Sequence, residues 1–230
     1  KVTTNYLVDD TGTEVDKEVD GRLNEGLISL NVPYEITESR KVDATISDDI
    51  KTSAVTAILL ALIFMFVYIA VRFRSWQYGL GGLAALLHDA LFVLGLYSLL
   101  WGIVPFSLEI DEAFIAAILT VVGYSINDTV VVFDRIREYL AEHKRDTNIK
   151  VFNMGINATL GRTLNTGATT MVVLLIIFLF GGVSIKGFVF GLLMGVLIGT
   201  YSSIFISSAI TVDLLKKNDN AVAGRKPVAA

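Results

Sequence analysis

Long runs of apolar residues, separated by short polar stretches, dominate the chain after its first 50 residues. A helix needs about 20 such residues to cross the hydrocarbon core of a bilayer. Runs of this length cover residues 53–71, 79–101, 113–133, 164–183 and 187–212. Trp76 and Trp101 lie at opposite ends of the second run, and amphipathic rings prefer the headgroup level of a membrane. The pattern therefore predicts a polytopic all-α membrane protein with five visible spans.

The basic residues between the spans predict their orientation. Loops that carry Lys and Arg tend to stay on the cytoplasmic side of the membrane. Most of the 19 basic residues follow span one, separate spans three and four, or follow span five: Arg72, Arg74, Arg135, Arg137, Lys144, Arg145, Lys150, Arg162, Lys216, Lys217, Arg225 and Lys226. We therefore expect residues 1–50 and the short loop 184–186 outside the cell, with residues 135–162 and the C-terminus in the cytoplasm.

The segment before the first span has a pattern of its own. Val15, Val19, Leu23 and Leu27 recur at helical spacing, and the stretch around Tyr34 alternates as a strand does. Residues 1–46 are therefore predicted to be part of a small α/β domain outside the membrane. Residues 47–215 then form the transmembrane domain.

Two cytoplasmic segments complete the predicted organisation. In the loop 134–163, apolar side chains recur at intervals of three and four residues, at Ile149, Phe152, Ile156 and Leu160. This spacing predicts a helix lying along the membrane interface before span four. The polar tail, residues 216–230, is expected to be disordered.

Composition narrows the class of protein further. Hydrophobic residues make up 53% of the chain, charged residues 18%, and the mean hydropathy is +0.61, which leaves too little polar surface for one soluble globule. The net charge of −4 supplies no basic field that would attract nucleic acid. The chain has no cysteine, so disulfides and thiolate metal sites are excluded.

A few ionisable residues interrupt the spans. Asp128 lies roughly 8 Å inside the cytoplasmic end of span three, at 1.5 Å per residue, and Asp89 lies near the middle of span two beside His88. Such carboxyls either satisfy a neighbouring hydroxyl in helix packing or belong to an ion pathway. Adjacent helical residues diverge by about 100°, so we expect Asp89 to face inward as a supporting group. Arg162, just before span four, either anchors the helix end or extends to the depth of Asp128.

Span five carries a stripe of small residues. Gly191, Gly195 and Gly199 recur every four residues, and Ser203 and Ser207 continue the spacing. Helices approach one another closely along such a stripe. We therefore predict that the three glycines pack against a neighbouring helix.

Two intramembrane carboxyls also suggest an aspartyl protease, but the required motif is absent. Ser125, Ile126 and Asn127 precede Asp128, which is not a GxGD pattern. His88 is not part of an HExxH motif, so a zinc site would lack its second ligand. We therefore expect no catalytic residues, no metal and no cofactor.

The motifs together resemble the SecF family, the partners of SecD in the membrane complex that assists bacterial protein export. The most specific match is the stretch 123–138, GYSINDTVVVFDRIRE. Shorter matches support it: His88-Asp89, Arg162-Thr163 with Thr166, the 180–182 motif FGG and the 199–203 motif GTYSS. The resemblance covers residues 42–215.

The resemblance implies an RND-like half-transporter bundle that uses the proton-motive force to promote preprotein translocation across the bacterial inner membrane. That family has six spans, so a sixth is expected upstream of Lys1. Expected partners are SecD, as a separate chain or as half of a fusion, the SecYEG channel, YajC and exported preproteins. Asp128 would be the titrating carboxyl, Arg162 its modulating charge, Asn127 a hydrogen-bonding neighbour and Asp89 a support. The alternative is a non-conducting scaffold that stabilises the translocon.

Overall fold

The computed structural model describes residues 15–29 and 44–223, all of them in helices or in the short connections between helices. The chain divides into two units, residues 1–55 and residues 56–230. In the first unit, α1 (Val15–Ser29) is the helix expected from the spacing of Val15, Val19, Leu23 and Leu27. The strand expected around Tyr34 lies outside the described residues.

Five long helices follow, and all are long and apolar enough to cross a membrane. They are α2 (Ala44–Phe73), α3 (Trp76–Leu100), α4 (Glu112–Glu142), α5 (Asn148–Phe180) and α6 (Val183–Ala223). Each corresponds to one of the apolar runs in the sequence. The chain is therefore a multi-pass membrane protein with an all-helical bundle.

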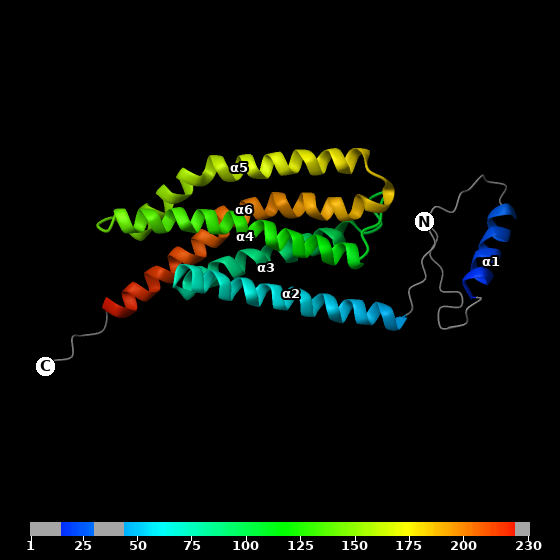
Figure 1. Ribbon diagram of the computed structural model, residues 1–230, viewed down its shortest axis with the longest axis horizontal. Helices are drawn as coiled ribbons and strands as arrows, with labels where there is room; N and C mark the ends of the chain where they lie inside the picture. Colours follow the sequence, from blue (N-terminus) through cyan, green and yellow to red (C-terminus); the bar gives the residue numbers. More distant parts are fainter. Residues whose placement is uncertain (1–14, 30–43, 224–230) are drawn as a thin grey trace. The chain divides into compact units, whose positions relative to one another are not determined.

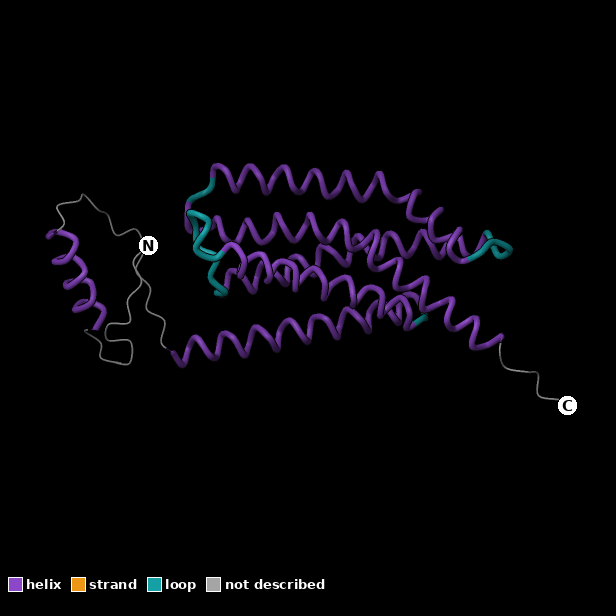
Figure 2. Tube along the Cα trace, turned by 180° about the vertical axis from the view of Figure 1, so that it is seen from behind, coloured by secondary structure: helices purple, strands orange, loops and turns teal. Residues whose placement is uncertain are grey.

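The helix α6 lies at the centre of the bundle, where it packs against α3, α4 and α5 (Figure 1). The opposite view shows the same long helices running side by side (Figure 2). The helix α2 is peripheral, and it buries Leu62, Ile69 and Phe73 against the other helices while most of its surface remains exposed. Exposed apolar surface of this kind suits contact with lipid or with another membrane protein.

Two apolar clusters fill the bundle at different levels. In one, the ring of Tyr78 lies 4.9 Å from the ring of Phe133 between centroids. In the other, the rings of Tyr97 and Phe114 lie 4.6 Å apart. Residues 79–96 of α3 and 115–132 of α4 connect the two clusters, and the buried polar residues Asp89, Ser125, Asp128 and Thr129 lie in these segments.

The segment before span four and the C-terminal tail differ from the expectation drawn from the sequence. The expected interfacial helix is not a separate element, because α5 is continuous from Asn148 to Phe180. Val151 and Phe152 in its first turns are buried, so this part of α5 packs against other helices of the bundle. The tail also differs, because α6 continues to Ala223.

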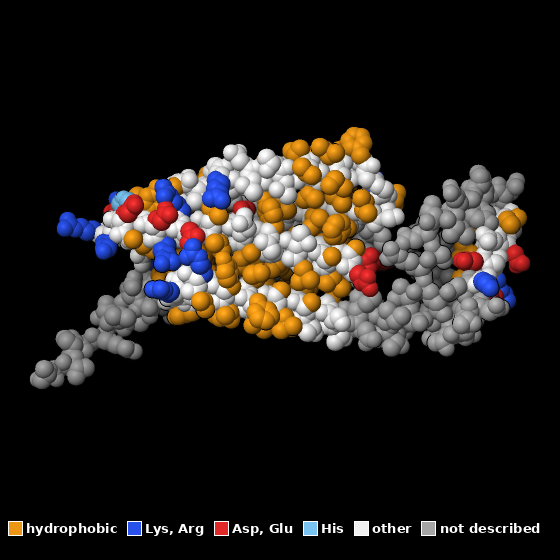
Figure 3. Space-filling model, viewed as in Figure 1, with side chains coloured by type: hydrophobic (Ala, Val, Ile, Leu, Met, Phe, Trp, Pro, Cys, Tyr) orange, Lys and Arg blue, Asp and Glu red, His pale blue; other side chains and the backbone are white. Residues whose placement is uncertain are grey.

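Charged and apolar side chains occupy different parts of the surface. Apolar side chains cover the middle of the bundle, and Lys and Arg gather at the end where the loop between α4 and α5 lies (Figure 3). At this end the Arg72 guanidinium lies 2.9 Å from the Asp134 carboxylate, which joins the end of α2 to α4. The distribution matches the charge asymmetry from which the orientation was predicted.

Candidate functional site

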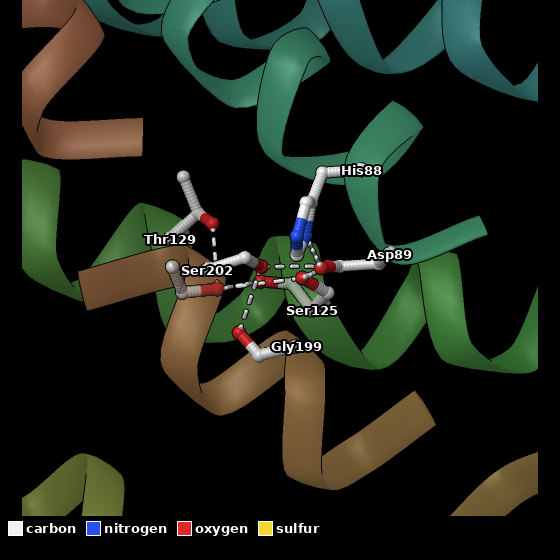
Figure 4. Close-up of polar contacts among 7 residues, drawn as sticks. His88, Asp89, Ser125, Thr129, Gly199 and Ser202 are labelled. Atoms are coloured by element: carbon white, nitrogen blue, oxygen red, sulfur yellow. Dashed lines mark hydrogen bonds and ion pairs between the residues drawn. The ribbon is translucent and has the colours of Figure 1, made fainter. Parts of the chain in front are cut away.

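Asp89 is enclosed by three helices. Its side chain is 0% exposed, and its Oδ2 accepts hydrogen bonds from Ser125 Oγ of α4 at 2.7 Å and from Ser202 Oγ of α6 at 2.8 Å. Figure 4 shows the two hydroxyls converging on the carboxylate. A carboxylate buried in an apolar bundle is costly unless its oxygens are hydrogen-bonded. Asp89 therefore links α3, α4 and α6 at the level of these serines.

A second set of hydroxyls extends this network along α4 and α6. Ser203 Oγ donates to the carbonyl oxygen of Ser125 at 3.0 Å and accepts from Thr129 Oγ1 at 2.9 Å. One turn further, the Ser207 hydroxyl donates to the Ser203 carbonyl oxygen of its own helix. Polar side chains that are satisfied in this way hold neighbouring membrane helices in one register.

The glycines of α6 make this close approach possible. A Cβ built on Gly199 would lie 3.2 Å from Ser125 Cβ, and one on Gly191 would lie 2.6 Å from the Tyr97 hydroxyl. At Gly195 the added atom would overlap the Val121 side chain. A larger residue at any of these positions would push α6 away from its neighbours.

His88 lies beside Asp89 at the edge of the bundle. Its side chain is 36% exposed, and its Nδ1 lies 3.2 Å from Asp89 Oδ1. The helix turns the two residues in different directions, so Asp89 faces the interior and the His88 ring reaches back to it from outside. His88 thus completes the hydrogen bonding of the carboxylate from the exposed side.

Asp128 is buried in a different way. It is 3% exposed, and its Oδ2 has no hydrogen-bond partner within the described chain. Arg162 of α5 lies close enough for its charge to act on the carboxylate, but no ion pair of 4.0 Å or less joins the two residues. The Arg162 side chain is exposed. Asp128 therefore has an opposite charge nearby but forms no ion pair with it.

Asn127 and Asp128 lie on different faces of α4. Asn127 is exposed on α4, whereas Asp128 is buried. The reason is geometric, because consecutive side chains on a helix point about 100° apart. Asn127 therefore belongs to the outer face of the bundle, and its role as a hydrogen-bonding neighbour of Asp128 stays a prediction.

Sequence reasoning did not identify the hydroxyl groups around Asp89. Hydropathy treats serine and threonine as nearly neutral, so Ser125, Thr129 and Ser202 did not interrupt the apolar runs. One available signal was the spacing of Ser125 and Thr129, which lie four residues apart and so share a face of α4. The described residues contain no group of His, Cys, Asp and Glu side chains able to hold a metal ion.

Comparison with known proteins gives consistent matches. A family model described as "Protein export membrane protein SecD/SecF, C-terminal" matches residues 24–217. The chain is 51% identical over 180 residues to the protein translocase subunit SecF of Rhodothermus marinus, a match that covers 78% of this chain and 58% of that protein. It is 38% identical over 192 residues to the SecF subunit of Escherichia coli O157:H7, covering 84% and 57% of the two chains.

Solved structures of SecDF match as well. A crystal structure of SecDF in a super-membrane-facing form superposes with a TM-score of 0.73 at 33% identity, covering 90% of this chain and 27% of that one. A crystal structure of SecDF from Thermus thermophilus, titled a translocon-associated membrane protein, gives a TM-score of 0.67 at 38% identity, covering 76% and 23%. The chain thus spans less than two thirds of the length of these relatives.

Proposed function

Because the chain belongs to the SecD/SecF family of protein-export membrane proteins, we propose that it acts as the SecF part of the accessory complex of the Sec translocase. In this role it uses the proton-motive force to promote preprotein translocation across the bacterial inner membrane. Asp128 carries the proton and Arg162 controls its binding. The SecD unit is the immediate partner, with SecYEG and YajC as neighbours in the membrane.

The observation that carries this proposal is the contrast between the two buried carboxyls. Asp89 accepts hydrogen bonds from Ser125 and Ser202 and is near His88, as expected of a structural group. Asp128 is nearly as buried, yet its Oδ2 is unpaired. Buried polar groups in proteins are almost always paired, so an unpaired one needs an explanation. A carboxyl that gains and loses a proton during a transport cycle supplies one.

The energy gained by a proton that crosses the membrane is comparable with the energy of a contact between Arg162 and Asp128. One unit charge that crosses 100 mV gains about 2.3 kcal/mol. A positive charge that moves into contact with a carboxyl changes the free-energy difference between its protonation states by about 1.4–4 kcal/mol. Making and breaking one contact between Arg162 and Asp128 is therefore sufficient to couple proton passage to a movement of α5 relative to α4.

Replacement of Asp128 tests the proposal. Asp128→Asn keeps the shape of the side chain but cannot titrate, so the complex with SecD should assemble while its gradient-dependent stimulation of export is lost. Asp128→Glu keeps a titratable group and should retain part of the activity. Export and proton conductance would be measured in inner-membrane vesicles with and without an imposed proton gradient.

The matched control is Asp89→Asn, which changes the same chemical group at a site where hydroxyls already satisfy the carboxylate. Export in that variant should still respond to the gradient. Full gradient-dependent export in Asp128→Asn would contradict the proton-carrier role and favour the non-conducting scaffold.

A further inference from the structure

Thr163 of α5 differs from the other threonines of its helix. Its side chain is 1% exposed, and its Oγ1 has no hydrogen-bond partner in the described chain. Thr159, Thr166 and Thr170 instead donate to carbonyl oxygens of the preceding turn, at 3.1 Å, 3.0 Å and 2.9 Å. Back-bonding of this kind is the usual way for a threonine within a helix to satisfy its hydroxyl. Thr163 is buried but does not use it.

The packing of α5 on α4 places Thr163 at the level of Asp128. The two helices are antiparallel neighbours joined by a short loop (Figure 1). A Cβ built on Gly155 would lie 2.9 Å from Ile136 Cα, so these two residues face each other. Eight residues further along α5 is Thr163, and eight residues back along α4 is Asp128. Both helices advance by the same rise per residue, so the pair lies at one depth.

The residues of α5 near Thr163 support this arrangement. Gly155, Thr159, Thr163 and Gly167 are buried and lie four residues apart, so they form one face of small side chains. This face begins against Ile136 of α4 and reaches α6 at Gly167, where an added Cβ would lie 2.8 Å from Thr200 Oγ1. Thr163 lies between these two contacts.

We infer that the Thr163 hydroxyl is the hydrogen-bonding partner of the Asp128 carboxyl during the proton cycle, which makes Thr163 a positioning residue for the proton carrier. The inference rests on the proposed function of Asp128. A hydroxyl donates to an ionised carboxylate and accepts from a protonated one, so a rotation of the Thr163 O–H serves both states. The proton itself binds to and leaves Asp128, and no other bond is made or broken. Arg162 precedes Thr163 directly, so one movement of α5 carries both groups.

Infrared difference spectroscopy of the full complex with SecD in lipid nanodiscs tests this inference directly. The carbonyl band of protonated Asp128 is identified by its loss in Asp128→Asn. In Thr163→Val the band should move to higher frequency, because the carboxyl loses its partner, whereas Thr163→Ser should leave it near its original position. The control Thr159→Val removes a buried hydroxyl one turn away that is bonded to its own helix, and should not move the band.

Export by the same variants gives the functional readout. Thr163→Val should reduce gradient-dependent stimulation about tenfold, the effect of one lost hydrogen bond to a buried polar group. Thr163→Ser should restore it, and the control Thr159→Val should leave gradient-dependent export unchanged.

Failure of the inference can be separated from failure of the proposed function. If the Asp128 band appears but is the same in Thr163→Val and in the unmodified complex, the role of Thr163 is wrong while Asp128 remains the proton carrier. If no protonated Asp128 band appears at any pH at which the complex is intact, the proton-carrier role is wrong and the role of Thr163 is overturned with it.

Discussion

Gly195 of α6 lies directly against the side chain of Val121 of α4, without room for even a methyl group between them. The backbone of α6 therefore packs directly on a side chain of α4 at this level. Such contacts stabilise membrane helices through close van der Waals packing, since lipid offers no hydrophobic drive to bring helices together.

The contact predicts that Gly195→Leu forces α6 away from α4 and weakens the bundle. Overpacking of a well-filled interior costs about 1–3 kcal/mol, and here backbone has to move as well. Assembly with SecD and the unfolding temperature of the purified complex should both fall. Leu197→Ile, at an exposed position of the same helix, should be tolerated. Normal assembly and export of Gly195→Leu would show that the helices do not pack this closely.

The hydrogen bonds of Asp89 predict different effects for two substitutions. Asp89→Ala removes the acceptor that the Ser125 and Ser202 hydroxyls share, at a cost of about 1 kcal/mol for each lost hydrogen bond. The two hydroxyls keep only their longer contacts with Ser203 Oγ at 3.3 Å and the Gly199 carbonyl oxygen at 3.2 Å. Asp89→Asn keeps an acceptor oxygen and should cost much less. Thermal unfolding of the purified complex compares the two variants. Equal unfolding temperatures for Asp89→Ala and the unmodified protein would rule out the structural role.

The exposed position of Arg162 predicts that its removal impairs coupling without impairing folding. Arg162→Ala removes no buried contact of the bundle, so the complex should assemble with an unchanged unfolding temperature. Gradient-dependent export should be lost, because Asp128 no longer meets an opposite charge during the cycle. Arg145→Ala removes an exposed charge from the loop between α4 and α5 and serves as the control. If both variants export equally well, Arg162 only anchors the end of its span.

The predicted orientation can be checked by labelling single cysteines, because the natural chain contains none. Arg145→Cys in the loop between α4 and α5 should react with a membrane-impermeant maleimide only after the membrane is opened. Ser184→Cys at the start of α6 should react from outside in intact cells. Both positions are exposed. Reaction of the cysteine at position 145 from outside would reverse the topology.

Much of the fold could be predicted from the sequence because membrane spans depend on one dominant quantity, the length of an apolar run. The helix ends were harder to predict. The charged residues between Asp134 and Glu142 end the apolar run but do not end α4, since a helix continues readily through charged residues once it has left the membrane. The same reason explains why α5 begins at Asn148, well before its apolar part.

The candidate site was harder still to predict from the sequence, since its geometry depends on how each helix is rotated about its axis. Asp89 and Asp128 stand out in the sequence because charge is rare in a span, and both proved to be buried. Asn127 was expected beside Asp128 from the resemblance to the SecF family, and the helix turns the two adjacent side chains toward different faces. The hydroxyl partners of Asp89 lie on α4 and α6, far away in the sequence, and no local pattern connects them to it.

The uneven distribution of cross-helix hydrogen bonds has a mechanical consequence. The Asp89 network joins α3, α4 and α6, so these helices resist sliding past one another. In its membrane-embedded part α5 presents small side chains to them, and the hydroxyls of Tyr124 and Thr170 approach only to 3.5 Å. This interface has fewer cross-helix hydrogen bonds than the interfaces around Asp89. A pull along α5 would therefore break fewer hydrogen bonds than a pull along α3, α4 or α6, and under the proposed function it would change the distance between Arg162 and Asp128.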